Sequence, residues 1–148
     1  QDYGTIVVEL DADAAPATVT NFVNLAKGGF YDGLTFHRVA AGFVLQGGDP
    51  KGNGTGGSGK NLKAEFNNRP HKRGAVSMAR AADPNSADSQ FFICFDDSTF
   101  LDRQYTVWGQ VISGMQAVDK IKRGTGPNGM VYDPDKIISM SVVADLQK

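Results

Sequence analysis

Residues 31–49 constrain the fold of this chain more than any other stretch. They read YDGLTFHRV, AAG and FVLQGGD in succession, so two short runs rich in Phe, Val and Leu flank a turn of small residues. This pattern is typical of a β-hairpin. Arg38 and Gln46 are set among the apolar residues. If Arg38 points inward from such a strand, it places a permanent cation on an apolar wall, a combination suited to recognising a neutral polar group.

Short periodic segments of two kinds fill the rest of the chain. Alternating or continuous apolar runs predict strands at residues 5–10, 75–79, 90–94, 105–111 and 137–143. Helical spacing after Pro16 predicts a helix that ends at Gly28, and a second helix follows Gly114 and ends at Gly124. Many strands, two helices near the two ends and no regular β–α alternation favour an all-β fold, a closed antiparallel sheet capped by helices.

Composition excludes several classes of protein. The chain has 148 residues, which favours one domain covering residues 1–148. Its net charge of −1 lacks the basic footprint of a nucleic-acid-binding protein, and no apolar run reaches the ~20 residues needed to span a bilayer. One cysteine, Cys94, excludes an internal disulfide bond. No secretory signal is visible, so we expect a cytoplasmic protein, or a periplasmic one if a segment before Gln1 has been removed.

The glycine-rich residues 47–60 predict a surface loop that nearly matches two nucleotide-binding motifs. Gly52, Gly54 and Gly57 fit G-x-G-x-x-G. Residues 54–60 fit G-x-x-x-x-G-K, but Asn61 stands where a Ser or Thr would bind magnesium. Neither match opens a convincing helix inside a βαβ unit, so neither supports nucleotide binding.

Conventional catalytic machinery is absent from the sequence. The only histidines, His37 and His71, and Cys94 form no cluster with metal-ligand spacing, so we expect no metal and no cofactor. His37 fits a hydrogen-bonded structural histidine and Cys94 a buried, inert thiol. No Gly-x-Ser-x-Gly elbow occurs. The remaining candidate for a functional group is Arg38, which lies among aromatic residues. The alternative interpretation is that Arg38 only forms an ion pair on the surface.

Six motifs in order carry a resemblance to a known family. They are FHRV (36–39), GF (42–43), QGGD (46–49), GTGG (54–57), SMA (77–79) and SQFFI (89–93). Together they resemble the cyclophilin family of peptidyl-prolyl cis–trans isomerases over nearly the whole chain. The resemblance implies a closed eight-stranded antiparallel β-barrel with a helix at each end and the active site on one outer face.

The resemblance also implies the site residues. Arg38 matches the family's catalytic arginine and Gln46 the glutamine that orients it. The positions that line the proline pocket are Phe43, Val44, Phe92, Leu101 and Tyr105. The groove that holds the residues before proline matches Ala79, Arg80, Ala81 and Gln90, with Arg80 acting through its backbone and Gly54 at the groove edge. Phe100 and Tyr105 replace a tryptophan and a histidine, as in the bacterial branch of the family.

Three hypotheses for function follow. The leading one is an isomerase of X–Pro bonds that assists protein folding, with proline-containing peptides and unfolded or folding proteins as partners. The alternative is a non-catalytic proline-peptide binding or chaperone module that uses the same groove; the third is a purely structural domain. Arg38 and Gln46 favour catalysis, because a binding module could dispense with both. We expect a monomer, because no extra apolar face is evident.

The replacement of tryptophan by Phe100 predicts weak cyclosporin binding with isomerase activity retained. In the family, tight cyclosporin binding is associated with the indole N–H of this tryptophan, and a phenylalanine ring has no such donor. Titration of cyclosporin against X–Pro isomerase activity measures the effect. Inhibition at nanomolar concentrations would contradict the prediction.

Overall fold

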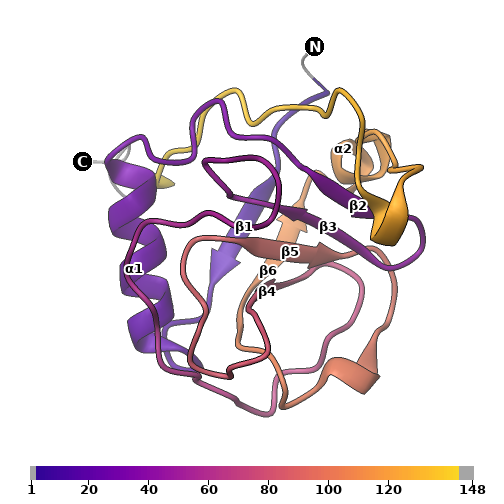
Figure 1. The fold of residues 1–148 in the computed structure, drawn as a ribbon. Coiled ribbons are helices and arrows are strands. Elements are labelled where there is room, and N and C mark those ends of the chain that lie inside the picture. Colours follow the sequence, from indigo (N-terminus) through magenta and orange to yellow (C-terminus); the bar gives the residue numbers. More distant parts are fainter. Residues whose placement is uncertain (1–2, 144–148) are drawn as a thin grey trace.

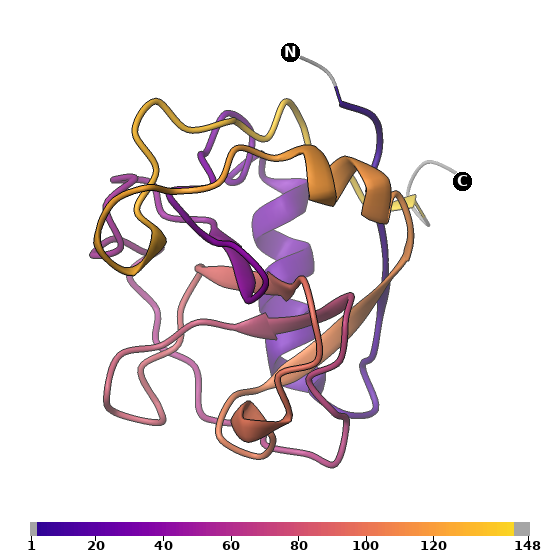
Figure 2. The same ribbon diagram turned by 90° about the vertical axis from the view of Figure 1, so that its right-hand side faces the viewer.

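The computed structural model describes residues 3–143 of the chain. The elements in chain order are β1 (Val7–Leu10), α1 (Pro16–Lys27), β2 (Arg38–Ala40), β3 (Val44–Gly47), β4 (Ala75–Met78), β5 (Phe91–Cys94), η1 (Thr99–Leu101), β6 (Val107–Ser113), α2 (Met115–Lys120) and η2 (Pro127–Gly129). The two α-helices lie at separate places around the central sheet (Figures 1 and 2), and both contribute residues to the same buried cluster. Every range predicted as a strand between residues 5 and 111 contains one.

The sheet has six antiparallel strands in the order β1-β6-β4-β5-β3-β2. The prediction of a closed eight-stranded barrel is therefore wrong for the described residues, because β1 and β2 are edges of an open sheet. Residues 137–143 form no strand. Ile137 exchanges backbone hydrogen bonds with Gly33 and Leu34 at 2.7 and 2.8 Å, and Thr35 forms a bridge with Lys136, but this pairing does not extend into residues 138–143. Alternation in the sequence predicts a half-buried segment and does not supply the repeated partners that a strand needs.

The second helix is also shorter than its sequence pattern predicts. It ends at Lys120, because Ile121 adopts an extended conformation with φ −67° and ψ 138°. Ile121 is buried in the core, and the chain then crosses to β2, where Gly124 N–H donates to Val39 O at 2.9 Å. Gly124 thus belongs to a loop docked on the sheet and does not cap the helix.

One row of cross-strand partners forms the centre of the larger core. Val39 pairs with Leu45, Leu45 with Ile93, and Ile93 with Val76. All four side chains are at most 3% exposed, and they belong to the cluster that includes α1 residues and Trp108. Successive side chains of a strand point to opposite faces of the sheet. The residues next to these four in their strands therefore point to the opposite face of the sheet.

That other face carries a second, smaller apolar cluster. Its buried members are Val44, Ala75, Phe92 and Cys94. This explains why β4 and β5 are buried along their whole length. Burial raises the pKa of the Cys94 thiol to about 12, which agrees with the inert thiol expected from the sequence.

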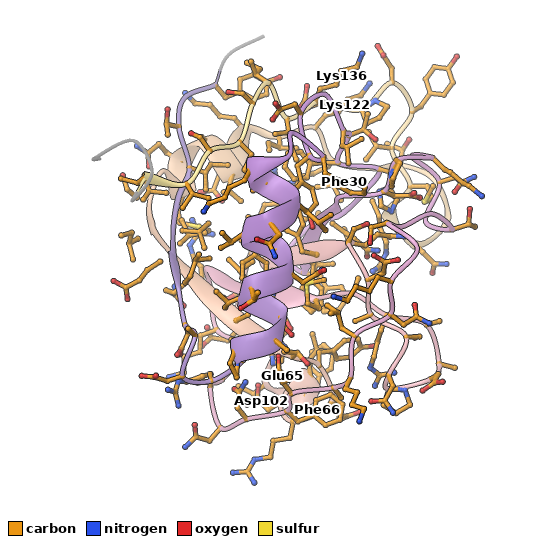
Figure 3. All side chains as sticks on the ribbon, turned by 90° about the vertical axis from the view of Figure 1, so that its left-hand side faces the viewer. Phe30, Glu65, Phe66, Asp102, Lys122 and Lys136 are labelled. Carbon is orange, nitrogen blue, oxygen red and sulfur yellow. The ribbon has the colours of Figure 1, made fainter. Side chains whose placement is uncertain are left out.

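The start of α1 is capped by a distant carboxylate. Pro16 occupies the first turn as predicted, but the N-cap residue Ala15 offers no side-chain acceptor. Glu65 supplies it: its carboxylate accepts from Ala17 N–H at 3.2 Å, and from Thr18 N–H and Oγ1–H, each at 2.7 Å (Figure 3). A negative group at this end also interacts favourably with the helix dipole.

We expect Glu65→Ala to lower the free energy of unfolding by about 1–2 kcal/mol, the usual cost of removing an N-cap acceptor. Glu9→Ala removes the same charge from an exposed position of β1 and is expected to change stability by less than about 0.5 kcal/mol. Urea unfolding of the two variants beside the wild type measures both effects. Equal losses would show that net charge, and not the cap, matters.

Candidate active site

A polar and aromatic row lies on the sheet face opposite the larger core. In register, Arg38 pairs with Gln46, Gln46 with Phe92, and Phe92 with Ser77. These residues alternate with the buried row of β2, β3, β5 and β4, which lie side by side in Figure 1. Three residues predicted for the site, Arg38, Gln46 and Phe92, are thus cross-strand neighbours.

Two neutral oxygens hold the Arg38 guanidinium. Nη1 donates to Gln46 Oε1 at 3.1 Å, and Nε donates to the backbone carbonyl of Asn128 at 2.7 Å. The guanidinium carbon lies 5.8 Å from the centroid of the Phe43 ring. Arg38 has no carboxylate partner in the described part of the chain, so the surface ion pair considered from the sequence is not formed.

A chain of amides fixes which end of Gln46 faces Arg38. Gln46 Nε2 donates to Gln90 Oε1 at 3.0 Å. Gln90 Nε2 in turn donates to the carbonyls of Gly54 and Gly56, at 3.0 and 2.9 Å. Because an amide nitrogen only donates and its oxygen only accepts, two carbonyls at one end of the chain set the orientation of both amides. The oxygen of Gln46 is therefore directed to Arg38.

A buried carboxylate organises the glycine-rich loop that supplies these carbonyls. Asp49, 1% exposed, accepts backbone N–H bonds from Lys51 (2.8 Å), Asn53 (3.1 Å) and Gly54 (2.6 Å). Burial opposes ionisation of the carboxyl, but these bonds outweigh it and hold the pKa of Asp49 below its usual value. A side chain at Gly56 would overlap Asp49. The sequence motif contained Asp49, but nothing in the pattern indicated this role.

The predicted proline pocket coincides with the smaller apolar cluster. Phe92 and Val44 are buried in it, and the partly buried residues that pack against them are Phe43, Ala79, Leu101 and Tyr105. The rings of Phe92 and Tyr105 meet edge to face, with centroids 5.8 Å apart. Phe100 stacks on Phe43 at 5.7 Å and is 67% exposed, so it forms an open aromatic rim.

The Arg80 side chain contacts both Tyr105, predicted for the proline pocket, and Ala81, predicted for the neighbouring groove. It lies over the Tyr105 ring, with the guanidinium carbon 4.6 Å from the centroid. Its nitrogens donate to Gln104 O at 2.8 and 3.0 Å and to Ala81 O at 2.9 Å. The sequence assigned Arg80 a backbone role only; in the structure its guanidinium also fixes Tyr105 and Ala81 relative to each other.

Sequence reasoning missed a buried network behind the pocket. His71 is fully buried, with Nδ1 3.0 Å from Asp102 Oδ1 and Nε2 3.0 Å from Ser77 Oγ. Its ring stacks on Phe92 at 5.9 Å. The three residues are connected as in a hydrolase triad, but Ser77 is fully buried, so no substrate carbonyl can reach its hydroxyl. The network supports Phe92 from behind.

The structure also bears on metal sites, membrane-spanning helices and other surface hollows. Residues 3–143 contain no group of three or more metal-ligating side chains arranged to hold an ion, and none of their helices is long and apolar enough to cross a membrane. Two surface hollows of about 580 and 570 Å³ lie elsewhere, one beside Arg69 and one beside the start of α1. Neither hollow contains any of the predicted site residues.

The site thus combines a constrained arginine with an apolar cluster on one face of an antiparallel sheet, an arrangement suited to binding a polar but uncharged group. Comparison with known proteins gives the family. The model of the cyclophilin type peptidyl-prolyl cis–trans isomerases matches residues 1–142. The chain therefore belongs to the cyclophilin family of peptidyl-prolyl cis–trans isomerases, enzymes that isomerise X–Pro peptide bonds.

Individual relatives agree with this assignment. A probable peptidyl-prolyl cis–trans isomerase of Brucella suis is 51% identical, covering 96% of this chain and 79% of its own. A peptidyl-prolyl cis–trans isomerase of Helicobacter pylori is 53% identical, covering 87% and 81%. The crystal structure of a Cryptosporidium parvum cyclophilin, determined in the presence of the dipeptide Ala-Pro, superimposes with a TM-score of 0.88 at 30% identity and covers 95% and 94%.

The two histidines predict how stability changes in mild acid. Burial lowers the pKa of His37 and of His71 below the usual value of 6.5, although Asp49 and Asp102 respectively oppose the shift. The unfolded chain therefore binds protons more readily than the folded one. The contribution of the two neutral histidines to the free energy of unfolding is fully present above pH 6.5. Below that pH the free energy of unfolding falls, by at most about 1.36 kcal/mol per pH unit for each histidine.

Urea unfolding between pH 7 and pH 5 measures this slope. The carboxyl groups with lowered pKa values titrate below 3.8 and leave this range to the histidines. His37→Gln and His71→Gln should each flatten the slope, whatever they do to stability at pH 7. A wild-type slope that neither substitution changes would contradict the prediction.

Proposed function

We propose that Arg38 catalyses X–Pro isomerisation by donating a hydrogen bond to the prolyl nitrogen of the twisted amide. The observation that carries this proposal is the state of the guanidinium. Nε and Nη1 of Arg38 each donate to an acceptor, while Nη2 has no partner among residues 3–143. The guanidinium lies beside the apolar cluster that contains Phe43 and Phe92.

The chemistry of the amide explains why such a donor accelerates the reaction. Rotation about a peptide bond costs ~18–20 kcal/mol because it breaks amide resonance. In the twisted transition state the nitrogen is no longer conjugated, and its lone pair becomes a good acceptor. A donor directed at this lone pair binds the transition state more strongly than the planar ground state, which lowers the barrier. Arginine cannot lose its proton in a protein, so it donates a hydrogen bond and is not a general acid.

The free energy of one hydrogen bond limits how much of the rate acceleration Arg38 can supply. A hydrogen bond that involves a charged group contributes roughly 1.5–3 kcal/mol, which corresponds to about ten- to a hundred-fold in rate. Acceleration beyond this must come from elsewhere. The twisted amide has lost its charge separation, so the apolar surroundings of Phe43, Phe92 and Leu101 favour it over the planar form.

We assign the remaining residues to two parts of one groove. Phe43, Val44, Phe92, Leu101 and Tyr105 form the seat of the proline ring, with Phe100 at the rim. Ala79, Arg80, Ala81, Gln90 and Gly54 hold the residues before proline, and Gln46 positions Arg38. The Ala-Pro dipeptide named with the related structure supports proline-containing peptides as ligands.

We further propose that the natural partners are unfolded or folding proteins with X–Pro bonds, bound by a monomer with one cyclophilin-like domain. Cyclosporin is expected to bind weakly, for the reason given at Phe100. A cytoplasmic location, or a periplasmic one if a segment before Gln1 is removed, remains our proposal for the compartment.

The alternative, a proline-peptide binding module without catalysis, makes a different prediction for Arg38. We expect Arg38→Ala to lower kcat/KM for a short X–Pro peptide by about ten- to a hundred-fold, while the Kd of the peptide changes little. Arg38→Lys keeps the charge but loses the planar set of donors and should recover only part of the activity. NMR exchange spectroscopy on the X–Pro peptide measures both the isomerisation rate and the Kd in one sample.

A wild type as slow as Arg38→Ala, with peptide binding intact, would favour the binding module. Val143→Ala provides a control, because Val143 is 52% exposed and is not part of the site. Its kcat/KM should equal that of the wild type.

A further inference from the structure

The loop of residues 124–131 is docked along the edge strand that carries Arg38. Gly124 N–H donates to Val39 O and Val131 N–H donates to His37 O, each at 2.9 Å, and Met130 forms a bridge with Arg38. Figure 1 shows η2, the middle of this loop, beside β2. The sequence of this segment, GTGPNGMV, contains three glycines and one proline. In the structure it covers a sheet edge that would otherwise present unpaired backbone groups.

Two consecutive residues in the left-handed region shape the centre of the loop. Asn128 has φ 59° and ψ 17°, and Gly129 has φ 87°. Hydrogen bonds between Gly129 N–H and Gly126 O, and between Gly126 N–H and Met130 O, both 3.1 Å, close the turn. Asparagine is one of the few residues with a side chain that adopt this conformation readily. The resulting turn places the Asn128 carbonyl 2.7 Å from Arg38 Nε.

Gly129 allows the loop to lie this close to β2. A Cβ atom at this position would lie 3.0 Å from both the Cα and the N of Ala40, and 3.1 Å from the carbonyl carbon of Val39. These are backbone atoms of β2, which cannot move aside as the end of a flexible side chain can. Any larger residue would therefore push the loop, and the Asn128 carbonyl with it, away from Arg38.

The carbonyl supplies the second of two fixed points on the guanidinium. Gln46 holds Nη1 from within the sheet, and Asn128 holds Nε from the loop. A planar group with acceptors on two different nitrogens cannot rotate about its Cδ–Nε bond without losing one of them. With Gln46 alone, the direction of Nη2 would not be fixed.

We propose that the loop of residues 124–131 is a positioning element of the active site, which aims Arg38 through the Asn128 carbonyl and depends on Gly129 for its close approach. This inference rests on the catalytic role proposed for Arg38. Both residues are proposed to act through Arg38.

Gly129→Ala is the direct test, and Gly33→Ala is its matched control. Gly33 has a similar left-handed φ of +80°, but no atom lies within 4 Å of the place that a Cβ would occupy there. Alanine at Gly33 therefore brings the same backbone strain without displacing a neighbour. We expect Gly129→Ala to lower kcat/KM by about ten-fold with an unchanged Kd for the X–Pro peptide. Gly33→Ala should keep the wild-type kcat/KM. Equal activities of the two variants would overturn the proposal.

Asn128→Gly separates the carbonyl from the side chain. Glycine keeps the carbonyl and adopts the left-handed conformation freely, so any loss of kcat/KM should be smaller than that of Gly129→Ala. A loss as large as that of Gly129→Ala would show that the Asn128 side chain, and not its carbonyl, is the functional group.

Two further measurements distinguish positioning from general damage to the fold. The Nε–H proton of Arg38, identified in ¹H–¹⁵N spectra by its disappearance in Arg38→Lys, should exchange with solvent faster in Gly129→Ala and not in Gly33→Ala. In an Arg38→Ala background, Gly129→Ala should cause no further loss of kcat/KM, because its effect passes through Arg38. Additive losses would overturn the positioning role while leaving the role of Arg38 intact; full activity of Arg38→Ala would instead refute the proposed function.

Discussion

The register between β2, β3, β5 and β4 is the constraint on which the rest of the structure depends. Burial of Val39, Leu45, Ile93 and Val76 in the larger core fixes this register, since a slip of one residue turns the side chains of a strand onto the opposite face of the sheet. The same register sets Arg38, Gln46 and Phe92 beside one another on the opposite face. The hydrophobic core thus determines the geometry of the candidate active site, although the two share no side chain.

Around this row, backbone groups do much of the positioning. The carbonyls of Gly54 and Gly56 orient Gln90 and, through it, Gln46, while the carbonyl of Asn128 holds Arg38. Carbonyls have fixed polarity and cannot reorient like a side-chain amide, so they define direction where an amide alone would not. Glycine allows these loops to approach closely, at Gly56 against Asp49 and at Gly129 against Ala40.

Sequence reasoning succeeded where the signal was local and periodic. It found the six strands of the observed sheet and α1 with Pro16 in its first turn. The resemblance to the cyclophilin motifs supplied most of the residues that line the smaller apolar cluster. It failed where a distant partner decided the outcome. Residues 137–143 form no strand and β1 and β2 are the edges of an open sheet. Helix α2 ends early because Ile121 enters the core, and α1 is capped by Glu65, 47 residues away from Thr18.

By itself, the sequence determined the strands, the family and the identity of Arg38, Gln46 and the aromatic residues near them, because apolar periodicity and ordered motifs are properties of neighbouring residues. Only the tertiary structure decided how Arg38 is aimed. Asn128, Gly129 and His71 act through contacts with distant segments of the chain, and Asp49 acts through amides of its own loop. Three of these contacts use backbone atoms, which every residue has. Such contacts leave no pattern in the sequence, since their energy depends on where the folded chain places them.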